Sequence, residues 1–158
     1  MKKLIKWGTV HKAVMFAVLL LFVVGIANAD QNHDINVVAR TLLAEAKGDG
    51  SNGMSAVACV IQQRVIERHL TAAEVCLQSK QFSCWNKATE SDRQTKVLKN
   101  DWQSSCAQKL ATAIVKGEAL DRSAVGFANS YCGTDCYPSW SWKAKRVATV
   151  GGHKFFRV

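Results

Sequence analysis

The sequence of 158 residues has one proline, and its first 29 residues include no acidic residue. No apolar run after residue 29 approaches the ~20 residues of a membrane-spanning helix, which excludes a protein with several membrane spans. Internal repeats and low-complexity linkers are absent, and neither a Gly-x-Ser-x-Gly elbow nor a phosphate-binding glycine loop occurs. Apolar residues make up 48% of the chain, too many for a disordered protein. The length indicates a single domain.

Residues 1–29 have the three-part pattern of a secretory signal peptide. Lysines precede an apolar run from Ala13 to Ile26, and Ala27-Asn28-Ala29 offers the small residues of a cleavage site after Ala29. No cysteine follows the run, which disfavours a lipoprotein anchor. An uncleaved signal anchor is the alternative. Both predict that the export machinery places residues 30–158, a single domain, in the periplasm, the cell envelope or the medium.

Six cysteines in an exported chain indicate disulfide bonds, since oxidising compartments favour their formation. Six cysteines allow 15 connectivities, and the sequence does not choose among them; local geometry suggests the pairs Cys59–Cys106, Cys76–Cys84 and Cys132–Cys136. Zinc is the competing interpretation, but no histidine has a matching spacing. We therefore expect no metal and no cofactor.

Apolar residues at helical spacing predict four helices. They cover residues 35–47, 54–68, 71–77 and 101–116. Asp34 is the expected N-cap of the first, Asp49 to Gly53 form a turn, and Thr71 with Glu74 makes a capping box. Residues 81–86 are expected to form a loop, and residues 87–100 have no clear pattern.

The last part of the chain is predicted to be irregular and then β. Residues 123–143 combine glycines with several aromatic residues, which is typical of loops. Two β-prone runs, 146–150 and 153–158, flank Gly151-Gly152 and predict a hairpin. The fold class expected is α+β, mainly α: a helical domain with a loop-rich C-terminal region and a short hairpin, stabilised by disulfides.

Glu45 is the strongest candidate for chemistry. It lies seven residues after Val38 and three after Leu42, so it projects from the apolar stripe of its helix. Burial there raises the pKa of a carboxyl, which suits a general acid. The alternative is a structural ion pair with Arg64. Arg64 lies seven residues after Val57, so the part of its side chain nearest the backbone also faces the packed side of its helix.

A glycosidase usually has a second carboxylate, and Asp49 is the nearest candidate. Asp49 is also an ordinary turn residue. Asp121 and Asp101 have weaker claims, and Asp101 is better explained as an acid in the first turn of a helix. His153 follows the glycine pair and is a candidate for substrate contact, although a hairpin histidine is more often structural.

The charge and the aromatic residues suggest an anionic or carbohydrate partner. Residues 1–29 hold four of the 21 basic residues, so residues 30–158 have a net charge of +5 instead of +9. No stripe of lysine and arginine occurs, so we expect no nucleic-acid partner. Trp85, Trp140 and Trp142 with Tyr137 form an aromatic group that suits sugar rings, or else simply packs over the core.

Three ordered blocks carry a resemblance to a known family. They are Ala44-Glu45-Ala46-Lys47-Gly48-Asp49 with Gly53 to Val65, then Val75-Cys76 to Gln81-Phe82-Ser83-Cys84-Trp85-Asn86, then Pro138-Ser139-Trp140 with Val150 to Phe156. These blocks resemble the SleB-type cell-wall hydrolases, the spore-cortex-lytic family. The sequence departs from that pattern at Ala44, Asp49 and Gln63, where the family has Gly, Glu and Asn.

The resemblance implies a lysozyme-like fold and cleavage of peptidoglycan between N-acetylmuramic acid and N-acetylglucosamine by a lytic transglycosylase. It places the catalytic role on Glu45. With the aromatic group, it indicates the substrate-binding residues Gln81, Phe82, Trp85, Phe127, Asn129, Trp140 and His153. The alternatives are a water-using muramidase or glucosaminidase with Asp49 as second acid, a non-catalytic wall-binding protein, and a small toxin or inhibitor. Nothing in the sequence requires more than a monomer.

Overall fold

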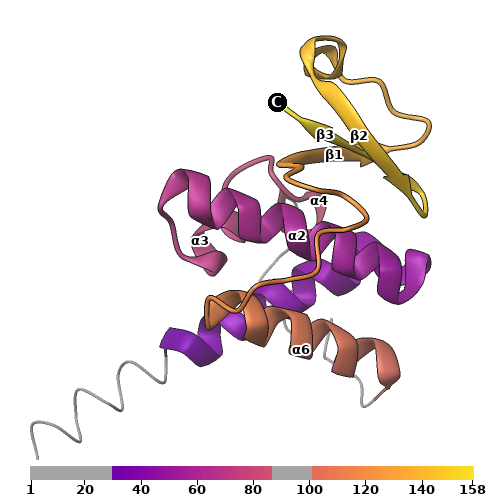
Figure 1. Cartoon of the computed structure of the whole chain (residues 1–158). Coiled ribbons are helices and arrows are strands. Elements are labelled where there is room, and N and C mark those ends of the chain that lie inside the picture. Colours follow the sequence, from indigo (N-terminus) through magenta and orange to yellow (C-terminus); the bar gives the residue numbers. More distant parts are fainter. Residues whose placement is uncertain (1–29, 87–100) are drawn as a thin grey trace, which may run out of the picture. The chain divides into compact units, whose positions relative to one another are not determined.

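The structure is a computed structural model that describes residues 30–86 and 101–158 (Figure 1). The expected signal peptide and the stretch 87–100 lie outside the described residues. His33–Val158 form one unit, to which the arrangement below refers. Within the described ranges, no helix is both long and apolar enough to cross a membrane.

The first helix covers residues 30–46, and a short turn, η1 (Lys47–Asp49), joins it to α2 (Gly50–Arg68). The break between these helices is shorter than expected, because the chain turns at Gly50, where φ is +68°. Asp34 is not an N-cap, since it lies inside the first helix. Its Oδ2 instead accepts a hydrogen bond from the Ala73 backbone, 39 residues away, at 3.4 Å.

The capping box is confirmed in α3 (Ala72–Leu77), where the Thr71 side chain and the Glu74 side chain satisfy each other's backbone N–H groups. Residues 81–86, expected as a loop, contain the short helix α4 (Ser83–Asn86). The last predicted helix is α6 (Trp102–Val115). Its N-cap is Asp101, whose Oδ1 accepts a hydrogen bond from Ser104 N at 2.7 Å.

The expected hairpin is present as β2 (Lys145–Val150) and β3 (His153–Arg157), joined by the two glycines. A third strand, β1 (Ser130–Gly133), was not expected and pairs with β3, giving an antiparallel sheet of order β1-β3-β2. The 3-10 turn η2 (Ser139–Lys143) lies between β1 and β2 in the chain. The fold is therefore α+β and mainly helical.

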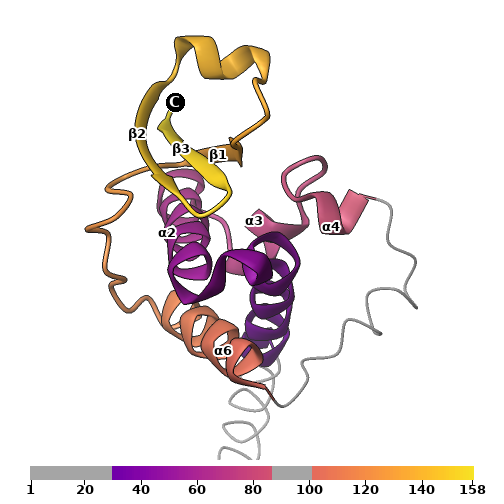
Figure 2. The same ribbon diagram turned by 90° about the vertical axis from the view of Figure 1, so that its right-hand side faces the viewer.

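The core joins both parts of the fold, since α2 lies between the sheet and α6 (Figure 2). Val38 and Leu42 of the first helix and Val57 and Ile61 of α2 have no exposed surface, which explains the helical periodicity seen in the sequence. Phe155 contributes the sheet's side of the core.

The three expected disulfides are not formed, since none of the six cysteines, all of which lie in the described residues, is bonded to another cysteine. The Cys59 thiol donates a hydrogen bond to the Asp121 carbonyl, and the Cys132 thiol donates one to the Cys136 carbonyl. Burial raises the pKa of Cys76 to about 12, which disfavours the thiolate that disulfide chemistry needs. The buried thiols pack here as small apolar side chains.

Candidate active site

Glu45 lies in the last turn of the first helix and is half-buried. Its Oε1 accepts two hydrogen bonds from Ser83, one from the backbone N–H and one from the hydroxyl, both at 3.1 Å. Its Oε2 is 3.1 Å from the hydroxyl of Tyr131, which donates to it. The first helix, α4 and β1 thus meet at one carboxyl group. Because Ser83 occupies both acceptor positions of Oε1, a transferable proton would be carried by Oε2.

Tyr131 is positioned by the sheet. Its ring stacks on Phe155 at 5.7 Å and receives the edge of the His153 ring at 5.1 Å. Burial raises the pKa of Tyr131, and the neighbouring charge of Glu45 raises it further. The phenol therefore keeps its proton at physiological pH and remains a donor to Glu45.

Asp49 is joined to the hairpin. Its Oδ2 lies 2.7 Å from Nδ1 of His153, and its Oδ1 accepts a hydrogen bond from Gly152 N at 2.8 Å. The turn packs closely against this carboxylate, since a Cβ atom added to Gly151 would lie 2.5 Å from Asp49 Cγ. Asp49 and His153 were both candidates from the sequence. The structure brings them together as a pair, one side-chain contact away from Tyr131.

Arg64 does not pair with Glu45. Its Nε donates to the Asn129 carbonyl at 2.7 Å, and its guanidinium lies over the Phe82 ring. Burial lowers the pKa of Arg64, and the like charge of Arg68 lowers it further. Within the described part of the chain, Nη1 of Arg64 is buried without a hydrogen-bond partner.

Three of the expected substrate-binding residues surround Ser83. Gln81 accepts hydrogen bonds from Arg68, and the Trp85 indole donates to the buried Thr41 hydroxyl at 2.9 Å. Phe82 is only 1% exposed and belongs to the core, where it packs near Tyr131. Trp85 and Phe82 therefore hold α4, and with it Ser83, against the first helix and the sheet.

Three further expected substrate residues have other surroundings, whereas His153 lies against Tyr131 as described above. Phe127 is 68% exposed, with Arg122 over its ring. The side chain of Asn129 bonds Glu67 and the backbone of Val158, so it ties down the end of the chain. Trp140 packs edge-on against Phe156, which lies on the other face of the sheet.

The remaining acids have local roles. Asp101 caps α6, and the Ser104 backbone bond lowers its pKa; Asp121 accepts a hydrogen bond from Ser123 N, which lowers its pKa. Among residues 30–86 and 101–158, no three His, Cys, Asp or Glu side chains lie close enough to hold a metal ion.

Two site residues, Ser83 and Tyr131, did not stand out as site residues in the sequence. Ser83 lies between the aromatic residues of the second block, and Tyr131 is one aromatic residue among several in a loop-rich stretch. Their position in those segments was the available signal. Their hydrogen bonds to a carboxyl 38 and 86 residues away depend on the tertiary fold.

The fold and site define a small α+β domain in which one carboxyl group lies at the junction of helix and sheet. A sequence profile described as cell wall hydrolase matches residues 48–156, so the chain belongs to the cell wall hydrolase family, enzymes that act on peptidoglycan. The matched range begins after Glu45. The expected resemblance to SleB-type hydrolases is confirmed.

Two solved structures are similar to this chain. One is the catalytic domain of the germination-specific lytic transglycosylase SleB from Bacillus anthracis, with a TM-score of 0.58, 23% identity and coverage of 78% of this chain and 93% of that chain. The other is the catalytic domain of the Bacillus cereus SleB protein, with a TM-score of 0.60, 24% identity and coverage of 80% and 91%. At these identities the similarity shows the shared fold. No curated protein matches the sequence.

Proposed function

We propose that this protein cleaves the glycan strand of peptidoglycan between N-acetylmuramic acid and N-acetylglucosamine, as a lytic transglycosylase in which Glu45 is the acid and the base. The observation that carries the proposal is the binding of the Glu45 carboxyl by Ser83 and Tyr131, which orients a half-buried acid with Oε2 as its active oxygen. The similarity to the Bacillus anthracis SleB catalytic domain, a germination-specific lytic transglycosylase, supports the same reaction.

In the first step, Glu45 donates the proton on Oε2 to the glycosidic oxygen, and the bond between this oxygen and C1 of the muramic acid breaks. The N-acetylglucosamine part leaves with a hydroxyl group. The substrate's own 2-acetamido oxygen attacks C1 and stabilises the cationic centre, as in substrate-assisted glycosidases. The two hydrogen bonds from Ser83 keep negative charge on Oε1 as the proton leaves.

In the second step, the Glu45 carboxylate removes the proton from the 6-hydroxyl of the same muramic acid. The 6-oxygen bonds to C1 and displaces the acetamido oxygen, which gives a 1,6-anhydro end. Glu45 is protonated again, and no water is consumed. One residue serves both steps, so the reaction needs no second catalytic carboxylate.

The engagement of Asp49 favours this route over a water-using hydrolase. Both oxygens of Asp49 already accept hydrogen bonds from the hairpin, at Gly152 and His153. These contacts fix the carboxylate against the hairpin turn, where a Cβ atom added to Gly151 would lie 2.5 Å from Asp49 Cγ, and such a fixed carboxylate suits a positioning role better than activation of a water molecule. We assign Asp49 and His153 a positioning role: they hold the hairpin, and the hairpin holds Tyr131 against Glu45.

The test is digestion of purified sacculi by residues 30–158, with Glu45→Gln beside it. Glu118→Gln is the matched control, because it makes the same carboxyl-to-amide change on an exposed side chain. We expect anhydro-muropeptides from the wild type and Glu118→Gln, detected by mass spectrometry, and none from a folded Glu45→Gln. Reducing ends in the products would show that the enzyme is a hydrolase and not a transglycosylase. A protein that binds sacculi but releases nothing would overturn the catalytic proposal.

We also propose that the enzyme acts as a monomer in the envelope or periplasm, or secreted outside the cell, with residues 1–29 as its signal peptide. The position of peptidoglycan outside the inner membrane and the tripartite pattern of that segment support this location. Mass spectrometry of the mature N-terminus tests cleavage after Ala29. A retained N-terminus would instead indicate a signal anchor.

A further inference from the structure

The sheet has a second face that the proposed reaction does not use. Side chains of β3 alternate, so His153 and Phe155 lie with Tyr131 on the side of Glu45, and Lys154 and Phe156 lie on the opposite side. On that opposite side the chain after β1 folds back over the sheet. It lines one side of an open pocket of about 250 Å³.

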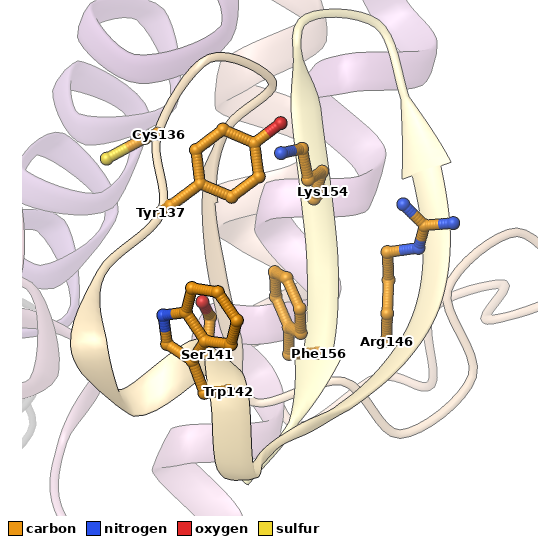
Figure 3. A pocket seen from close by; sticks show the side chains of 7 residues that line it. All are labelled: Cys136, Tyr137, Ser141, Trp142, Arg146, Lys154 and Phe156. Atoms are coloured by element: carbon orange, nitrogen blue, oxygen red, sulfur yellow. The ribbon is translucent and has the colours of Figure 1, made fainter.

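The pocket combines aromatic surface with two positive charges. Figure 3 shows Tyr137 and Trp142 on one side, Arg146 on the other, and Lys154 and Phe156 between them. Trp142 is 83% exposed and Tyr137 is 71% exposed, unlike the rings of the core. Such large exposed aromatic side chains beside a pocket are typical of a binding surface.

The positive charges of the pocket are not neutralised within the described part of the chain. Lys154 is 91% buried as a residue, and its Nζ lies 3.7 Å from the centre of the Tyr137 ring without an ion pair there. Arg146 likewise has no carboxylate partner among those residues, and no lining residue is acidic. The Lys154 ammonium over the Tyr137 ring and the Arg146 guanidinium both line the pocket, and two such cations favour a ligand that carries a carboxylate.

We propose that this pocket binds the peptide attached to muramic acid, through a carboxylate held by Arg146 and Lys154 and an aliphatic part resting on Trp142 and Tyr137. The proposal rests on peptidoglycan as the substrate. The peptide is short, bears free carboxylates and has small apolar side chains, so it matches the charge and surface of the pocket. The volume suits two or three residues of a peptide and is too small for a folded partner.

The placement allows one substrate to occupy both sites. Cys132 of β1 pairs with Lys154, and Tyr131, the neighbouring residue of β1, contacts Glu45. The two sites thus lie on opposite faces of one sheet, at neighbouring residues of its edge strand β1. An extended peptide spans about 3.3–3.6 Å per residue, so a peptide of four or five residues covers roughly 13–18 Å along a path around that edge.

The experiment compares two preparations of soluble glycan fragments from the same sacculi, one with its peptides and one from which an amidase has removed them. Equilibrium binding is measured with the Glu45→Gln protein, so that cleavage does not interfere. We expect the peptide-bearing fragments to bind about tenfold more tightly, which corresponds to about 1.4 kcal/mol, and added salt to reduce this preference.

Arg146→Gln and Lys154→Met are expected to abolish the preference for peptide-bearing fragments. Lys145→Gln is the matched control, because this neighbouring exposed residue of β2 does not line the pocket. Lys154→Met keeps the length of the side chain. If this variant does not fold, the binding measured with Arg146→Gln decides the test, because Arg146 is exposed. Equal affinity for both preparations in every variant would overturn the proposal, as would concentration-dependent dimerisation that Trp142→Ala removes, since the occupant would then be a second copy.

Turnover by the proteins that retain Glu45 separates this proposal from the proposed function. Anhydro products without a peptide preference would leave the reaction standing and remove the pocket's role. A peptide preference without any product would do the reverse.

Discussion

The contact between the hairpin turn and Asp49 predicts an unusually large cost for a single added methyl group at Gly151. The backbone of Gly151 has φ +56°, a left-handed conformation that costs any residue with a Cβ atom about 1–2 kcal/mol. The new Cβ would also lie 2.5 Å from Cγ and 2.6 Å from Oδ1 of Asp49. No heavy atoms pack at such distances, so the turn or the carboxylate must move.

That movement breaks the hydrogen bonds of Asp49 to Gly152 and His153. Hydrogen bonds to a charged group contribute about 1.5–3 kcal/mol, and less where water reaches them. We therefore expect Gly151→Ala to lower the free energy of unfolding by about 3–5 kcal/mol in total. Gly126→Ala is the matched control, because Gly126 has φ +53° and open space around its missing Cβ. It should cost only the backbone part, about 1–2 kcal/mol.

Urea denaturation of both variants measures the difference. A second background, Asp49→Gly, removes the three atoms nearest to the new Cβ, so there Gly151→Ala should cost about as much as Gly126→Ala. Equal destabilisation by the two alanines in the wild-type background would refute the argument that Asp49 and the turn are packed against each other. Turnover of sacculi should fall with Gly151→Ala and stay near the wild-type value with Gly126→Ala.

Two further predictions concern Tyr131 and Glu67. Tyr131→Phe removes a hydrogen bond worth about 1.5–3 kcal/mol to the Glu45 carboxyl, so kcat on soluble glycan fragments should fall roughly 10- to 150-fold with KM little changed; a change in KM alone would make Tyr131 a binding residue. At Glu67, burial raises the carboxyl pKa, but hydrogen bonds from Asn129, Gln63 and Arg157 outweigh it and lower the pKa. The stability that Glu67 adds over Glu67→Gln should be complete above about pH 5 and disappear as the pH falls through the lowered folded value, which urea titrations across pH measure. A difference independent of pH would contradict this.

Much of the fold follows from local signals. The capping box at Thr71, the N-terminal acid of α6 at Asp101, and the two glycines of the hairpin each act over a few residues, so they were predictable. Strand β1 was not, because its four residues show no alternation of burial and become a strand only by pairing with β3. Its partner residues lie 20 to 26 positions further along the chain.

Acidic residues were harder to interpret than apolar ones. Asp34 is a residue type that commonly caps the N-terminus of a helix, yet its carboxylate accepts a hydrogen bond from the backbone N–H of Ala73 in α3. Asp49 looks like a turn residue, and it does lie at a turn, but its side chain bonds a hairpin more than one hundred residues away. A carboxylate has acceptor sites for several donors, and local sequence does not show which distant N–H groups arrive. Glu45 was the exception, because its position on an apolar stripe already required specific partners.

The contacts of the site form one continuous series. Asp49 holds His153, the edge of His153 lies against Tyr131, and Tyr131 bonds Glu45. Asp49 and Glu45 are four residues apart at the junction of two helices, so the series leaves the helices, crosses the hairpin and β1, and returns to almost the same place. The segment from Glu45 to Asp49 therefore binds the sheet at both of its ends, through Tyr131 at one end and His153 at the other. Because Glu45 receives its other hydrogen bonds from Ser83, movement of the hairpin would change the donors of Oε2 and leave those of Oε1 in place. The oxygen that the proposed reaction uses is thus the one whose surroundings depend on the sheet.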